Sequence, residues 1–106
     1  MQQLKTIFLN RRFLKMKIVI NTCYGGFGLS KEALAFYNER ADTAIKYEDD
    51  IKRNDPILIE IVGQLGEAAN GGFAKLKVVQ IPDDVQWQIE EYDGVEWVAE
   101  KHRIWN

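Results

Sequence analysis

A glycine-rich stretch is the first candidate for binding chemistry in this sequence. Gly25, Gly26 and Gly28 follow a short apolar run and precede a serine that can begin a helix. A strand, a flexible turn and a helix start in this order can hold a phosphate, because the first amides of a helix have no partner within it. The stretch matches neither G-x-G-x-x-G nor a nucleotide triphosphate loop. It therefore predicts either a loop that contacts a ligand or a tight structural corner, in which Phe27 stacks on a planar group or fills the core.

Arginines and aromatic side chains are the next candidates. Arg53 precedes a strong helix-capping sequence, and Arg103 stands near two tryptophans at the chain end. Arginine binds phosphate through paired hydrogen bonds, and aromatic faces bind bases by stacking. Phe73 lies beside two glycines and an amide, where it is expected to be exposed. Two alternatives stay open: Arg103 stacks on tryptophan at a subunit interface, and Phe73 folds back on a helix end.

The other reactive side chains do not form a recognisable catalytic set. Cys23 and His102 are the single cysteine and the single histidine, whereas zinc sites use three or four ligands. A Cys–His pair would also need a third group to orient it, so Cys23 is interpreted as a core residue. Carboxylates gather at 48–50, 83–84 and 90–91, which is typical of solvated turns, and none makes a distinctive acid–base pair. We expect no metal, no cofactor and no enzyme activity.

Composition indicates one small folded domain. The 106 residues are 46% hydrophobic and 28% charged, which is ordinary for a globular protein with one modest core. No run approaches the roughly 20 apolar residues of a membrane span, and no secretory leader is visible. A single cysteine suits a reducing compartment. We therefore expect a cytoplasmic protein that does not bind membranes.

Charge divides the chain into two parts. Residues 1–15 carry four basic residues and no acid, which leaves −6 for residues 16–106 out of the formal net charge of −2. An acidic body argues against binding to duplex nucleic acid. Met16 opens a natural first strand, so residues 1–15 are predicted to be a leader from an upstream start codon or a basic arm that contacts a partner. Residues 16–106 are predicted to form a single ligand-binding domain.

Hydrophobic periodicity predicts the elements that position these residues. We expect a strand over 17–23 and a helix over 31–40, followed by a loop with at most one short strand over 41–54. A second helix is expected from 56 to about 70, then a strand over 74–82 and hairpin strands over 85–92 and 95–105. Ser30 and Asp55 are the expected helix caps. The order predicts an α+β domain with two helices and a small, mostly antiparallel β-sheet that ends in a C-terminal hairpin.

The hairpin has two apolar faces. A two-residue turn at Asp93 and Gly94 pairs Tyr92 with Val95 and so fixes which side chains share a face. One face then carries Val85, Trp87, Ile89 and Val98, and the other carries Tyr92, Trp97, Arg103 and Trp105. A chain this short cannot easily cover both faces, so we expect a homo-oligomer.

Three segments resemble a family of small phage and prophage proteins. They are MKIVINTCYGGFGLS, DPILIEIVGQLGEAANGGFAKLKVVQIPD and IEEYDGVEWVAEKHRIW, and they are similar to the Thoeris anti-defence protein one family. The resemblance covers about 16–105, interrupted at 41–54. It implies a molecular sponge, a protein that binds signalling nucleotides and keeps them from the host's immune effector without cleaving them. The implied ligands are glycocyclic ADP-ribose isomers made by bacterial TIR-domain proteins, and some members assemble further and take up cyclic oligonucleotides.

The resemblance also implies ligand contacts in this chain. The residues are Gly25, Gly26, Phe27, Arg53, Asn70, Phe73 and Arg103. The two phenylalanines would stack on adenine, the arginines would bind phosphates, Asn70 would contact a base or ribose, and the glycine amides would assist. Pockets between subunits of a dimer or larger oligomer would enclose the ligand. Two rival functions are a small phosphodiesterase that uses the acidic clusters and a non-catalytic protein–protein interaction module built on the hairpin.

Overall fold

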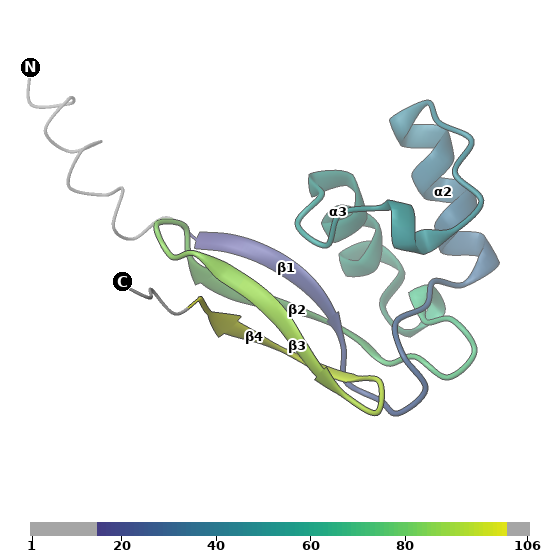
Figure 1. Cartoon of the computed structure of the whole chain (residues 1–106). Helices are drawn as coiled ribbons and strands as arrows, with labels where there is room; N and C mark the ends of the chain where they lie inside the picture. Colours follow the sequence, from purple (N-terminus) through teal and green to yellow (C-terminus); the bar gives the residue numbers. More distant parts are fainter. Residues whose placement is uncertain (1–14, 102–106) are drawn as a thin grey trace, which may run out of the picture.

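The computed structural model describes residues 15–101 and confirms the α+β class. The predicted N-terminal extension, apart from Lys15, lies outside the described residues, as do His102, Arg103 and Trp105. The helices are α2 (Lys31–Ala41) and α3 (Pro56–Leu65), with short 3-10 helices η2 (Glu48–Asp50) and η3 (Gly66–Ala69). The strands are β1 (Lys15–Asn21), β2 (Leu76–Pro82), β3 (Trp87–Tyr92) and β4 (Val95–Glu100), and they form two antiparallel pairs (Figure 1).

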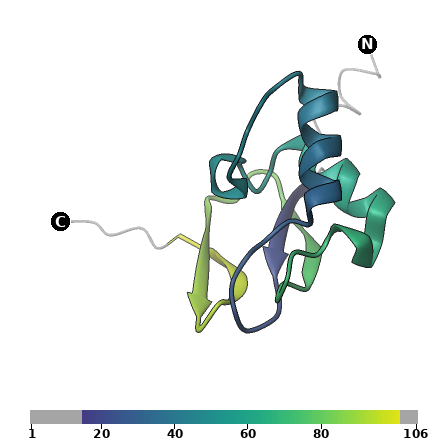
Figure 2. The ribbon, with the colours of Figure 1, turned by 90° about the vertical axis from the view of Figure 1, so that its right-hand side faces the viewer.

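The β1–β2 pair forms the middle layer of the fold. Its register runs from Lys15 opposite Pro82 to Asn21 opposite Leu76, so β1 begins two residues before the predicted strand and also ends two residues earlier. Alternation places Val19 on one face and Ile18 and Ile20 on the other, and all three are at most 4% exposed. Both faces are therefore covered. The helices lie on one side of this sheet and the hairpin on the other (Figure 2).

Helix caps appear where the sequence predicts them. The Ser30 side chain accepts a hydrogen bond from the Ala33 amide, and the Asp55 side chain accepts from the first amides of α3. The predicted end of the second helix near residue 70 was wrong for the α-helix, which stops at Leu65 because Gly66 takes a positive φ of 57° and the chain tightens into η3. Between α2 and α3 the chain contains η2 and no strand.

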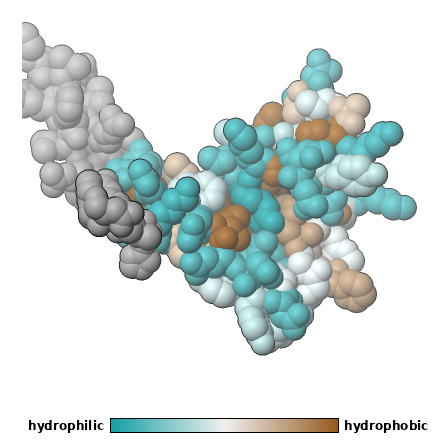
Figure 3. Space-filling model, viewed as in Figure 1, coloured by the Kyte–Doolittle hydropathy of each residue, from teal (hydrophilic) through white to brown (hydrophobic). Residues whose placement is uncertain are grey.

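The helical layer supplies the apolar core. Helix α3 contacts α2 and both strands of the sheet. Buried residues in this cluster include Val19, Leu29, Ala33, Tyr37, Ile51, Leu58, Ile61, Val62 and Ala69. Among the described residues, no helix is long and apolar enough to cross a membrane. The surface in Figure 3 is mainly hydrophilic, with small separate hydrophobic patches.

The predicted hairpin register is confirmed. Tyr92 pairs with Val95 and Glu90 with Trp97, and both turn residues have positive φ, 54° at Asp93 and 92° at Gly94, as a type I′ turn requires. The face that carries Ile89 and Val98 is half-buried toward β1. On the opposite face Tyr92 is 73% and Trp97 43% exposed. The chain therefore covers one of the two apolar faces itself, and the homo-oligomer stays a prediction.

Candidate functional site

The glycine stretch is a corner enclosed by two other turns. On one side, a Cβ added to Gly94 would stand 2.7 Å from the Gly25 nitrogen, and the Gly25 amide donates to the Asp93 carbonyl at 3.4 Å. On the other side, a Cβ added to Gly71 would stand 2.7 Å from the Gly28 carbonyl carbon. Real Cβ atoms are not found so close to backbone, so glycine is needed for these approaches.

The corner accounts for much of the glycine pattern without a phosphate. The Gly25 amide already has a protein acceptor, and Gly26 lies against the hairpin turn at Gly94. The start of α2 is capped by Ser30. A ligand contact by the Gly25 and Gly26 amides stays a prediction, and it would have to compete with the Asp93 carbonyl for the first of them.

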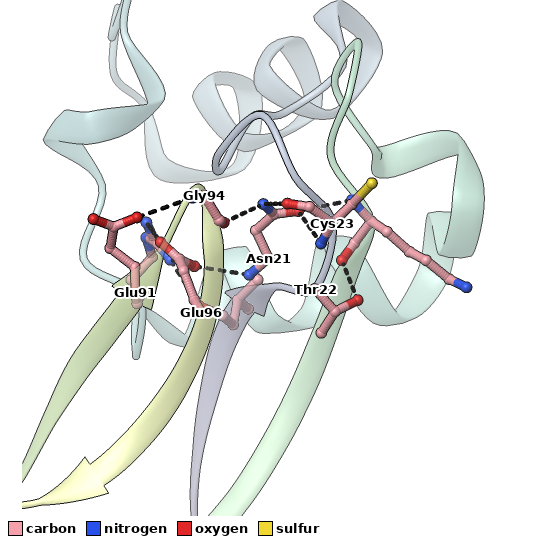
Figure 4. A network of polar contacts seen from close by, with 9 residues as sticks. Asn21, Thr22, Cys23, Glu91, Gly94 and Glu96 are labelled. Carbon is pink, nitrogen blue, oxygen red and sulfur yellow. Dashed lines mark hydrogen bonds and ion pairs between the residues drawn. The ribbon is translucent and has the colours of Figure 1, made fainter.

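Asn21 ties the three turns together through one buried side-chain amide (Figure 4). Its Nδ2 donates to the carbonyls of Cys23 at 2.6 Å and Gly94 at 2.7 Å. Its Oδ1 accepts from the Lys75 amide at 2.8 Å and more weakly from the Cys23 amide at 3.3 Å. Four hydrogen bonds satisfy the whole amide. One residue at the end of β1 thus holds the glycine corner, the turn before β2 and the hairpin turn.

Arg53 and Phe27, both predicted ligand contacts, do lie together. The Arg53 guanidinium is 3.6 Å from the centroid of the Phe27 ring. Its two terminal nitrogens bind Glu96, Nη1 to Oε1 at 2.6 Å and Nη2 to Oε2 at 2.8 Å. The backbone amide of Asn21 also donates to Glu96 Oε1 at 2.8 Å.

This ion pair is largely shielded from solvent, with 20% of the Arg53 and 9% of the Glu96 side chain exposed. A carboxylate therefore fills the bidentate position that a phosphate would take. Phe27 packs against the core cluster, which agrees with the second of its two predicted roles. Phosphate binding by Arg53 stays a prediction, and it would require displacement of Glu96. Glu96 was not among the predicted site residues, although the hairpin register places it on the face toward β1.

Asn70 and Phe73 occupy the turn before β2 in different ways. The Asn70 Oδ1 accepts from the Leu76 amide at 2.8 Å, and its backbone bridges to Leu29, so this side chain shapes the turn. Phe73 is 81% exposed, and its Cβ lies against Gly25. It does not fold back into the core.

Two further exposed aromatics flank the same corner. Tyr24 precedes Gly25 and is 65% exposed, and Tyr92 precedes the Asp93 whose carbonyl accepts from Gly25. Tyr92 was predicted only as part of the hairpin face, and Tyr24 was not among the predicted site residues. The signal for Tyr24 was its position directly before two glycines. The seventh predicted contact, Arg103, lies outside the described residues.

Ionisable groups elsewhere serve the fold. Tyr37 is 5% exposed, and its hydroxyl donates to Asp55 Oδ2 at 2.6 Å. Burial, together with this hydrogen bond and the Asp55 charge, raises the pKa of Tyr37 to about 12. Cys23 is half-buried and does not belong to the core cluster, so its interpretation as a core residue was wrong. Within residues 15–101, no three histidine, cysteine or carboxylate side chains gather to hold a metal ion.

Comparison with known proteins identifies no relative. No protein-family model matches the chain, and no curated protein or solved structure is significantly similar to it.

Proposed function

We propose that this protein binds and sequesters a cyclic nucleotide signal of the glycocyclic ADP-ribose class without cleaving it. In the cytoplasm of a bacterial host it would keep the signal from a Thoeris effector. The observation that carries this proposal is the exposure of Phe73. Burial of a phenylalanine is worth about 2 kcal/mol, yet this ring is 81% exposed beside the glycine corner. A stacked base would cover it.

Two carboxylates at the corner are already engaged by other groups of the protein, which favours binding over hydrolysis. Both carboxylate oxygens of Glu96 accept hydrogen bonds from the Arg53 guanidinium, and Oε1 also accepts from the Asn21 backbone amide. Glu91 accepts a hydrogen bond from the Gly94 amide. Carboxylates that serve as acceptors for backbone and arginine are poorly placed to remove a proton from water.

Tight binding needs more contacts than one ring provides. An affinity near 10 nM requires about −11 kcal/mol, whereas one stacked base contributes about 1–3 kcal/mol. The exposed hairpin face around Trp97 offers a surface for a second subunit. Tyr92 lies at the turn end of that face, beside the glycine corner. We propose a homo-oligomer whose pockets lie between subunits, as the family resemblance implies.

Ligand recovery tests the proposal. Purified protein is incubated with glycocyclic ADP-ribose, washed and heat-denatured, and the supernatant is separated by chromatography. Intact ligand in near-stoichiometric amount is expected. Cleaved product would instead favour the phosphodiesterase, and no retained nucleotide would favour the protein–protein interaction module.

A further inference from the structure

We propose that Tyr24 and Tyr92 join Phe73 in one aromatic surface around Gly25, and that this surface takes the adenine of the ligand. The inference rests on the proposed function and assigns its base-binding side chains. The three aromatics come from three separate segments, the turn after β1, the turn before β2 and the end of β3.

Contacts with a single residue bring the three segments together. Tyr24 is the chain neighbour of Gly25, and the Phe73 Cβ would stand 2.8 Å from a Cβ added to Gly25. Tyr92 adjoins Asp93, whose carbonyl accepts from the Gly25 amide at 3.4 Å. Gly25 has a φ of 108°, which side chains rarely adopt. Because glycine has no side chain to cover the backbone, a flat ligand can approach the corner closely between the aromatic residues.

Exposure separates these rings from the structural aromatics. Tyr24, Phe73 and Tyr92 are 65%, 81% and 73% exposed. Tyr37 is buried, and Phe27 packs on the core under Arg53. The core therefore does not depend on the three exposed rings.

The backbone beneath the aromatic surface is held by hydrogen bonds to one side chain. Asn21 bonds directly to Cys23, Lys75 and Gly94, each within two residues of one of the three rings. Preorganised segments lose little conformational entropy when a ligand binds. Asn21 thus bonds to the backbone beside all three rings.

The charged groups around the surface indicate where the phosphates of the ligand would lie. Lys75 is exposed, lies two residues from Phe73 and donates its backbone amide to Asn21. Glu91 and Asp93 are exposed beside Tyr92. The phosphates are expected on the Phe73 side, near Lys75, with the base over the corner.

Titration of alanine variants with glycocyclic ADP-ribose tests the assignment. Tyr24→Ala and Tyr92→Ala are each expected to weaken binding by about 5- to 150-fold, the range for one lost base stack. Tyr47→Ala is the matched control, since Tyr47 is 69% exposed but lies between α2 and α3. Proton NMR provides a second readout, because stacking shifts the adenine H2 and H8 resonances upfield.

The outcomes separate this inference from the proposed function. If wild type binds and both tyrosine variants bind equally well, the aromatic surface is wrong while the sponge stands. If wild type retains no ligand, the sponge fails and the inference with it. Light scattering is run on each variant, and a Tyr92→Ala protein that binds weakly only because it changes its assembly would remove Tyr92 from the surface.

Discussion

On the Val19 face of the β1–β2 sheet the contacts are apolar, whereas at the turn end of the hairpin they are hydrogen bonds and an ion pair. Leu58 and Ile61 fill the helical side and are at most 1% exposed. At the turn end of the hairpin side, Asn21, Arg53 and Glu96 make the polar contacts. Apolar contacts weaken gradually as atoms are removed, but a buried charge that loses its partner keeps its full desolvation cost. The two sides should therefore respond differently to mutation.

The largest effect is expected from Glu96→Ala. This substitution leaves the Arg53 guanidinium shielded from solvent without its carboxylate partner. It also removes the acceptor of the Asn21 backbone amide. We expect a loss of about 3 kcal/mol in the free energy of unfolding, measured by urea denaturation. Glu100→Ala, exposed on the same strand, should stay within about 0.5 kcal/mol of wild type.

The paired variant Arg53→Met with Glu96→Leu sharpens the test. When both charges are replaced by apolar groups, part of the lost stability should return, because no charge is left buried. The Asn21 backbone amide still lacks its acceptor in this variant, so recovery should be incomplete. If the double variant is no more stable than Glu96→Ala, the unpaired charge of Arg53 is not what destabilises Glu96→Ala.

Leu58→Ala probes the apolar side. Leu58 is fully buried in the core cluster, so truncation should cost about 2–3 kcal/mol through lost transfer energy and a cavity. Urea denaturation measures this, with Leu58→Met as the conservative control at below about 1.5 kcal/mol. A cost under about 1 kcal/mol would show that the helical layer is not the main apolar core.

Tyr37→Phe is expected to have a smaller effect that depends on pH. Near pH 7 the lost hydrogen bond to the Asp55 carboxylate should cost about 2 kcal/mol. The folded-state pKa of Tyr37, about 12, lies above the unfolded value of about 10, so the folded state holds the phenol proton more tightly. The stability that the raised pKa of Tyr37 contributes is fully present below a pH of about 10, and it is lost as the pH rises toward 12.

Unfolding curves at a series of alkaline pH values test this linkage. The stability difference between wild type and Tyr37→Phe should shrink across that window. A difference that stays constant from pH 9 to 12 would remove the Tyr37–Asp55 contact from the explanation.

Structure that depends on neighbouring residues could be predicted from the sequence, whereas the polar contacts between distant residues could not. Local patterns gave the Ser30 and Asp55 caps and the hairpin register around Asp93 and Gly94. The polar contacts join residues far apart in the chain. Arg53 and Glu96 are separated by 43 positions, and Asn21 and Gly94 by 73. Neither a helical nor a strand period encodes such pairs, so the division of the strands into two pairs was not foreseen.

Predicted site residues show the same division. Phe27 and Arg53 were both chosen and do meet, but they bind each other and Glu96. Phe73 was expected to be exposed because glycines precede it, and it is. Residue type and local context indicated which groups suit a nucleotide, while only the tertiary structure distinguishes those already engaged from those that are exposed.

The most direct test of the central claim is a calorimetric titration of glycocyclic ADP-ribose into wild type, Phe73→Ala and the control Tyr47→Ala. Wild type and the control should bind tightly and equally. Phe73→Ala should bind more weakly by about 1–3 kcal/mol with an unchanged melting temperature, because the ring is 81% exposed. No heat of binding in wild type, or equal affinity in all three proteins, would contradict the proposed function and its site.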